Sequence, residues 1–272
     1  MSKHHGVSMY SLDNMERRNR DAKGDIIPAE GLRTSACLIA LRQEIWSVLV
    51  YRRPFRLPLA EDMVYSSLQP TDDFTWANRL VVWCADILRF CFGSSTSVAT
   101  PLNNSLAHEK WRALKDVDDR WKNVPPPCFR ALYYCPPRPE QGHCFPLIWQ
   151  LNDAHVVAMQ HLELGRMLLA AYNPQRQRVG LSFSASNVAI ECQLRESVKI
   201  LCGLALADKQ FQAGMVIAAL GISIGGEFFD KPQERRAIVE FLNTLEAEHA
   251  WPTKSILRAL QDAWDLEPTH SP

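Results

Sequence analysis

The chain has 272 residues, and its 30 Lys and Arg residues balance its 30 Asp and Glu residues, so the formal net charge at pH 7 is zero. Hydrophobic residues make up 47% of the chain and charged residues 22%, which is typical of a globular protein and excludes collagen-like structure and disorder throughout. The balance also excludes a strongly cationic nucleic-acid binder, because neutralising phosphates needs an excess of Lys and Arg.

Cysteine use and hydrophobic runs indicate the compartment. Eight cysteines without a C-x-x-C pair are too few for a disulfide scaffold. The first residues, Met1–Ser8, contain no apolar stretch of a secretory signal. The longest uncharged run, Gln210–Gly226, has 17 residues, fewer than the ~20 apolar residues of a membrane span. We therefore expect reduced thiols in the nucleus or cytoplasm, and no membrane partner.

The front of the chain predicts a polar, flexible tail over residues 1–33, followed by helices. Apolar residues recur at helical spacing from about Thr34 until two prolines, Pro54 and Pro58, interrupt the pattern. A second helix is predicted over Phe74–Phe92 and a third over Leu102–Val124, which the prolines after it terminate.

Residues 125–150 separate a front half (34–124) from a back half (151–268). Seven of the 17 prolines fall within residues 125–146, together with several aromatic residues. Large aromatic side chains bury about 150–250 Å² each, so we expect this loop to join the two halves in one continuous core. Either Trp121→Ala or Trp149→Ala would then cost about 3–5 kcal/mol. The alternative is an exposed aromatic patch that docks a partner.

The back half predicts further helices. Asn152 or Asp153 starts one, Ser184 or Ser186 starts the next, and the apolar residues 211–229 predict a buried helix with close packing at small residues. Asp230 is predicted to cap a fourth, with Pro in its first turn. Only short runs, 129–134 and 179–183, could be strands. The prediction is an all-α array of about eight helices in one domain, residues 34–268.

Four residues of the central loop raise the question of a metal: Cys128, Cys135, His143 and Cys144. The gaps along the chain are longer than the short chelate loops of structural zinc sites, and adjacent His143 and Cys144 cannot easily aim at one ion. We expect no metal ligand and no cofactor here.

Other residues that could take part in catalysis or phosphate binding also lack the pattern that such a site requires. The run Gly221–Glu227 lacks the Lys and Ser/Thr that follow the last glycine of a P-loop. The apolar surroundings of Cys202 are expected to raise the pKa of its thiol and leave it unreactive. His155 and His161 are predicted to face different sides of one helix. The remaining candidates are His249, Glu246 and Glu248, which form no recognisable dyad. We expect no catalytic residue and no enzymatic activity.

A series of segments in fixed order carries a family resemblance. They are Leu41–Trp46, Trp76–Arg79, Asp86–Gly93, Trp111–Trp121, Pro126–Arg130, Tyr133–Tyr134, Phe145–Trp149, Met159–His161, Cys202–Ala205, Gly225–Glu227, His249–Thr253, Leu260 and Trp264. Together they resemble the C-terminal regulatory domain of fungal zinc binuclear cluster transcription factors, the Arca-like group. The resemblance covers about residues 36–266.

The resemblance implies a helical regulatory domain in the nucleus that controls transcription by RNA polymerase II, with transcription factors or co-regulators as protein partners. The family's N-terminal cysteine cluster has no matching positions, since only Cys37 precedes residue 84. We therefore expect no stoichiometric zinc and no sequence-specific DNA binding by this chain, which is either a truncated product or a stand-alone partner of a complete factor. The alternatives are a helical enzyme or small-molecule sensor with a pocket between helices, and a plain protein-interaction scaffold.

Overall fold

The computed structural model describes residues 29–59, 65–67, 69–93, 101–123, 125–176 and 183–265. The chain divides into two compact units, residues 1–39 and 40–272. The described residues contain eight α-helices and one small two-stranded sheet, which confirms the all-α prediction. None of the described helices is long and apolar enough to cross a bilayer.

Helix α2 (Ala29–Tyr51) contains the boundary between the two units. It begins five residues before Thr34, where the apolar pattern starts, so residues 29–33 of the predicted tail are helical. In its first part the Ser35 hydroxyl donates to the Gly31 carbonyl at 2.9 Å. The rest of the predicted tail, residues 1–28, lies outside the described residues.

In the second unit, α3 (Asp73–Phe92) and α5 (Asp153–Ala171) pack against each other, and α4 (Pro101–Asn123) contacts both. Each of the first two helices begins at a side-chain cap. Asp72 accepts a hydrogen bond from the Thr75 amide, and Asn152, one of the two predicted caps, accepts one from the His155 amide. These caps satisfy amides that the helix itself leaves unpaired.

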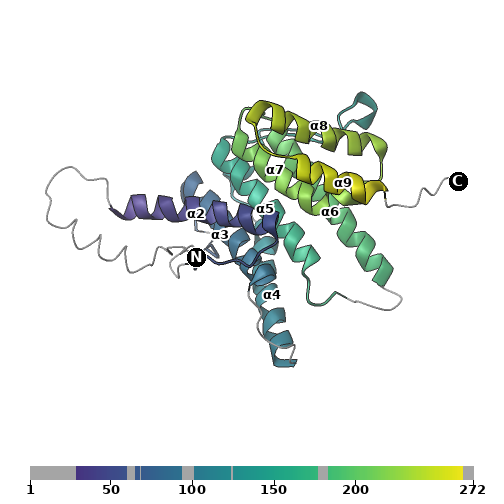
Figure 1. Cartoon of the computed structure of the whole chain (residues 1–272). Helices are drawn as coiled ribbons and strands as arrows, with labels where there is room; N and C mark the ends of the chain where they lie inside the picture. Colours follow the sequence, from purple (N-terminus) through teal and green to yellow (C-terminus); the bar gives the residue numbers. More distant parts are fainter. Residues whose placement is uncertain are drawn as a thin grey trace, which may run out of the picture. The chain divides into compact units, whose positions relative to one another are not determined.

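Helices α6 (Phe183–Leu206) and α7 (Gln212–Gly225) lie against α5 and complete the helical core (Figure 1). The predicted close packing at small residues is confirmed at Gly221, where an added Cβ would lie 2.2 Å from Leu201 Cδ1. A larger side chain at this position would therefore require the Leu201 side chain to shift.

A short 3-10 turn, η4 (Gly226–Phe228), leads from α7 to α8 (Pro232–His249) and then α9 (Lys254–Asp265). The predicted cap at Asp230 is wrong. Lys231 occupies the N-cap position, and its side chain makes no capping hydrogen bond to the described residues. Pro232 stands at the first helical position, as predicted, and its fixed φ favours a helix start without a side-chain cap.

The central segment contains the sheet that the sequence did not predict. Strand β1 (Tyr133–Cys135) pairs antiparallel with β2 (Leu147–Trp149), and the turns η2 (Pro127–Phe129) and η3 (Pro139–Gln141) flank and connect them. Eleven residues, 136–146, separate the strands, so the short turn signal of a tight hairpin is missing.

Burial divides the aromatic residues of this segment into two groups. Trp121, Phe129 and Phe145 are 3%, 4% and 8% exposed. Tyr133 and Trp149 are 51% and 52% exposed, and Tyr134 is exposed as well. The prediction of one continuous aromatic core is therefore right for the first group and wrong for the second, whose strands carry the side chains out of the core.

Candidate functional site

One surface feature is the aromatic hairpin, which we define as β1, β2 and residues 136–146 between them. Tyr133 stands opposite Trp149 in the ladder, and their rings meet edge-on with centroids 6.1 Å apart. The Leu132 amide extends the pairing by donating to the Trp149 carbonyl at 2.8 Å. Leu132 and Leu151 are 65% and 55% exposed. The ring pair is therefore an exposed apolar feature on a defined backbone, and exposed leucines flank both strands in the sequence.

The aromatic hairpin is fixed to the helical core on its other side. Ile148 is the neighbour of Trp149 in β2, so its side chain points to the opposite face of the strand pair. It is 7% exposed, and Phe145 is also buried. Strand β2 contacts α6. At the connecting end, Arg138 and His143 exchange backbone hydrogen bonds of 2.7 and 3.1 Å. The surface is therefore held in place by buried side chains and by backbone pairing.

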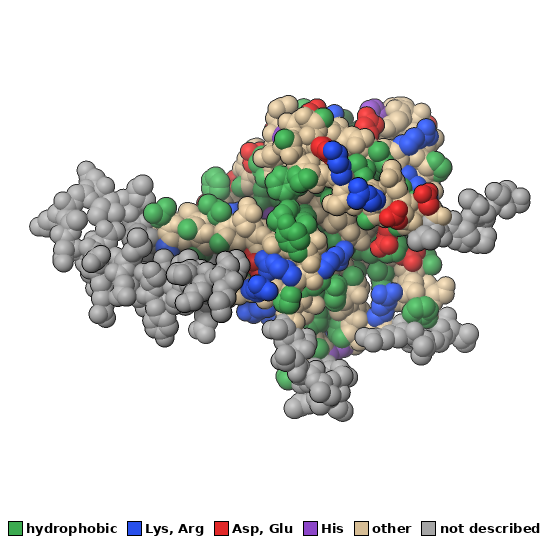
Figure 2. Space-filling view, in the orientation of Figure 1, with side chains coloured by type: hydrophobic (Ala, Val, Ile, Leu, Met, Phe, Trp, Pro, Cys, Tyr) green, Lys and Arg blue, Asp and Glu red, His purple; other side chains and the backbone are tan. Residues whose placement is uncertain are grey.

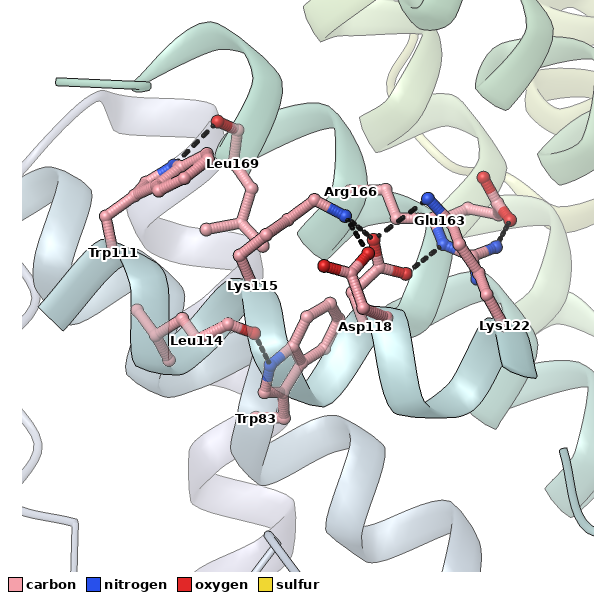
Figure 3. Close-up of polar contacts among 10 residues, drawn as sticks. Trp83, Trp111, Leu114, Lys115, Asp118, Lys122, Glu163, Arg166 and Leu169 are labelled. Atoms are coloured by element: carbon pink, nitrogen blue, oxygen red, sulfur yellow. Dashed lines mark hydrogen bonds and ion pairs between the residues drawn. The ribbon is translucent and has the colours of Figure 1, made fainter. Parts of the chain in front are cut away.

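A buried cluster of charges joins α4 and α5 (Figure 3), and a hydroxyl of α6 contacts it. Asp118 accepts hydrogen bonds from Arg166 Nε at 2.6 Å and from Lys115 Nζ at 2.7 Å. Arg166 also donates to Glu163, which accepts a further bond from the Ser197 hydroxyl at 2.9 Å. Asp118 and Glu163 are 1% and 3% exposed, so nearly all of their interactions are with protein groups.

Electrostatics keeps this cluster ionised. Burial raises the pKa of Asp118, but the positive charges of Arg166 and Lys115 outweigh that effect and hold the pKa below its usual range. The same carboxylates raise the pKa of Arg166 despite its burial. Because the buried charges pair with one another, the cluster offers no uncompensated charge to a ligand, which favours a structural role.

Two cavities adjoin described helices. One, of about 240 Å³, lies beside the charge cluster and is lined by residues that include Trp111, Arg176 and Gln193, but it is smaller than the ~300–1,000 Å³ of typical ligand pockets. The other, of about 620 Å³, is a surface groove over α8 and α9. Of its charged residues, Arg236, Glu240 and Glu248 are exposed and Arg235 is partly buried over the Trp264 ring, so the groove lacks the fully buried, convergent polar groups that fix a small ligand.

One group of three side chains among the described residues has metal-ligand atoms within 4.8 Å of one another: Asp73, Cys128 and His155. His155 is fully buried, and its Nε2 lies 3.1 Å from Asp73 Oδ1. Even so, neither ring nitrogen makes a hydrogen bond to the described residues. The Phe129 ring stacks on the imidazole at a centroid distance of 4.2 Å, and Asn152 Nδ2 donates to Asp73 Oδ2 at 2.9 Å.

These residue types also invite comparison with a nucleophilic Cys–His–Asp arrangement. Burial raises the pKa of the Cys128 thiol, and the negative charge of Asp73 raises it further. An activated cysteine needs the opposite, a positive environment that lowers the thiol pKa. The geometry therefore disfavours Cys128 as a nucleophile.

The other residues weighed from sequence lie apart from this group. The structure does not bring Cys135, His143 and Cys144 together with Cys128 as a set of potential ligands. His161 Nδ1 lies 2.7 Å from the Val157 carbonyl oxygen, and burial lowers the pKa of the imidazole to about 4, so it is neutral at pH 7.

Three more of those residues have local roles. Burial raises the pKa of the Cys202 thiol, which keeps it protonated. His249 Nε2 lies 2.7 Å from the Lys209 carbonyl oxygen, and Glu246 accepts a hydrogen bond from the Thr253 hydroxyl at 2.8 Å. Within the described part of the chain, these contacts hold helix ends and connections rather than a reaction centre.

The features described so far thus belong to an all-α protein with an exposed aromatic hairpin, a buried charge cluster around Asp118 and a partly exposed group of Asp73, Cys128 and His155. Family models, curated proteins and solved structures were each searched for similarity to this chain, and none of the three searches found a match.

Proposed function

We propose that the chain is a protein-binding regulatory domain in the control of RNA polymerase II transcription, and that the aromatic hairpin is its docking surface. One observation carries the proposal: Tyr133 and Trp149 face each other across the strand pair and are each about half exposed. The resemblance of the sequence to regulatory domains of fungal zinc cluster transcription factors supports the nuclear role. The chain then has no catalytic task and acts through a transcription factor or co-regulator.

The chemistry of the surface suits a protein partner. Tyr and Trp are enriched at interfaces because they offer large contact areas with few rotatable bonds. The rings of Tyr133 and Trp149 already contact each other, so less conformational entropy is lost when a partner covers them. Leu132 and Leu151, which flank the strands in the sequence, are exposed apolar residues as well. The occupant we propose is an extended apolar segment of the partner protein.

Charge distribution supports a protein rather than a nucleic acid as the partner. On the face of the second unit that Figure 2 shows, Lys and Arg side chains lie among Asp, Glu and hydrophobic side chains. This mixture agrees with the zero net charge of the chain. Nucleic-acid binding depends on clustered positive charge.

A transcription reporter tests the proposal. The full chain is fused to a heterologous DNA-binding domain in a fungal host, and reporter output is measured for the parent, for the double variant Tyr133→Ser with Trp149→Ser, and for Val188→Ser. Val188 is a matched control because it is 57% exposed on α6 and is not part of the aromatic hairpin.

We expect the parent fusion to change reporter output relative to the DNA-binding domain alone. The double variant should lose most of that change at equal protein level, and Val188→Ser should keep it. A parent fusion without effect contradicts the role in transcription. An active double variant contradicts docking through the aromatic hairpin.

A further inference from the structure

We propose that Asp73, Cys128 and His155 form a zinc site, with water as the fourth ligand. The three residues come from distant parts of the sequence. Asp73 is the first residue of α3, Cys128 lies in η2, and His155 lies in the first turn of α5. The site goes beyond the proposed docking function and involves no residue of the aromatic hairpin.

The first argument is the unsatisfied imidazole. Buried polar atoms in native proteins almost always have a partner, and an exception calls for a functional explanation or a bound ion. His155 is 0% exposed; its Nδ1 has no partner among the described residues, and its Nε2 has only the Asp73 carboxylate, which lies outside good hydrogen-bond geometry. The distance from Nε2 to Asp73 Oδ1 is 3.1 Å. A cation shared by the two side chains would give Nε2 a ligand bond in place of this poorly aligned contact.

The distances fit a tetrahedral ion after a small adjustment. Zinc bonds of about 2.0–2.3 Å place neighbouring ligand atoms about 3.3–3.7 Å apart in a tetrahedron. The Nε2–Oδ1 distance of 3.1 Å is already close to this, and all three ligand atoms lie within 4.8 Å of one another. The upper bound of 4.8 Å exceeds the tetrahedral spacing by about 1 Å, so ion binding requires a movement of that size at most.

The donor set selects the metal. A sulfur, an imidazole nitrogen and a carboxylate oxygen suit zinc, whereas magnesium and calcium prefer oxygen ligands alone. When the ion binds, a bond forms between Cys128 Sγ and zinc, and the thiol proton is released to solvent. The Cys128 thiolate and the Asp73 carboxylate then balance the two positive charges of zinc, and the imidazole remains neutral.

Neighbouring groups hold the ligands in position. Asn152 donates to Asp73 Oδ2 and leaves Oδ1 directed toward the imidazole, while Phe129 stacks on the His155 ring. Such outer contacts orient ligands at metal sites. Asp73 and Cys128 are partly exposed, which gives water access to the fourth position.

This inference replaces the sequence-based expectation of no stoichiometric zinc. That expectation weighed Cys128 only with its neighbours in the central loop, whereas the fold places it near residues of α3 and α5. The proposed ion would join the starts of these two helices to the turn η2, which precedes the aromatic hairpin.

Metal titration of the full-length chain tests the site. The purified protein is stripped with a chelator and titrated with zinc against a chromophoric competitor, and a second sample is titrated with cobalt. We expect one zinc per chain and, with cobalt, a thiolate-to-metal charge-transfer absorption of a tetrahedral site. A zinc content well below one per chain, or cobalt binding without the charge-transfer band, overturns the proposal.

Variants locate the ion. Cys128→Ser and Asp73→Ala should each weaken zinc binding by at least about tenfold, and Cys128→Ser should abolish the charge-transfer band. Cys135→Ser is the matched control, because Cys135 is a partly exposed cysteine of the same segment that lies outside the ligand group. It should bind zinc as the parent does.

Circular dichroism of the metal-free variants establishes that they are folded before titration, and the cobalt spectrum of the parent tests the site even if one variant fails to fold. Zinc binding of equal affinity in Cys128→Ser and the parent means that the ion binds elsewhere, for example at His4 and His5, and overturns the assignment.

Discussion

Trp121 and Trp149 stand on opposite sides of the same proline-rich segment, and their environments differ completely. Trp121 is 3% exposed and meets Trp76 and Phe129 edge-on, with ring centroids 5.5 and 5.3 Å away. Trp149 is 52% exposed and meets Tyr133 at 6.1 Å. The difference shows that a high content of aromatic residues and proline predicts an ordered segment. It does not predict which of the aromatic side chains are buried in the core.

The backbone explains the difference. Trp121 lies in the last turn of α4, on the face that packs against the rest of the helical unit. Trp149 lies in a strand, where successive side chains point to opposite faces. Ile148 therefore turns into the core when Trp149 turns out. The predictions below test this division, in order of decreasing effect on stability.

The largest effect is expected at the buried side. Trp121→Ala should lower the free energy of unfolding by about 3–5 kcal/mol, because it removes a large buried ring and leaves a cavity. Chemical denaturation followed by circular dichroism measures the change. A loss below about 1 kcal/mol, the range of ordinary surface substitutions, would contradict the placement of Trp121 in the core.

An intermediate effect is expected where the central segment rests on α6. A Cβ added at Gly203 would lie 2.5 Å from the Pro146 carbonyl oxygen, so Gly203→Ala should cost about 1–3 kcal/mol through overpacking. Gly31→Ala is the matched helical control, since an added Cβ there meets nothing within 4 Å. The control should be neutral or more stable by up to about 1 kcal/mol. Equal effects of both substitutions on the midpoint of unfolding would contradict the contact.

The smallest effect on stability is expected at the exposed side. Trp149→Ala should lower the free energy of unfolding by about 1 kcal/mol or less, since it removes an exposed ring and one edge-on aromatic contact. This replaces the value of about 3–5 kcal/mol expected from sequence, which assumed burial. Thermal unfolding of Trp149→Ala and Trp121→Ala, measured under the same conditions, compares the stability losses of the two variants directly. Similar losses in both variants would remove the distinction between the two sides.

Much of the helical fold follows from local patterns. The apolar stripe of α2, the polar cap at Asn152 and the small residues of α7 correspond to features that short sequence windows contain. The strand pair was missed because its partners lie beyond the reach of a turn signal. The wrong cap at Asp230 shows that a fitting side chain two residues before Pro does not guarantee a cap.

The polar clusters could not be predicted, since pairing between distant segments leaves no local signal. Asp73, Cys128 and His155 are separated by 55 and 27 residues, and Asp73 shows no distinguishing pattern of its own. The pairing of Asp118 with Arg166 likewise joins two helices. A partial signal existed, because Asp73 and His155 both fall in first turns, directly after the capping residues of α3 and α5.

Hydroxyl-radical footprinting of the intact chain, read by mass spectrometry, tests most directly whether the aromatic hairpin is a free surface. The oxidation rates of Trp149 and Tyr133 are compared with that of Trp121 under native conditions and after unfolding. We expect Trp149 and Tyr133, each about half exposed, to react at a substantial fraction of their unfolded rates, and Trp121, at 3% exposed, to be strongly protected. Protection of Trp149 equal to that of Trp121 would contradict a surface available to a partner.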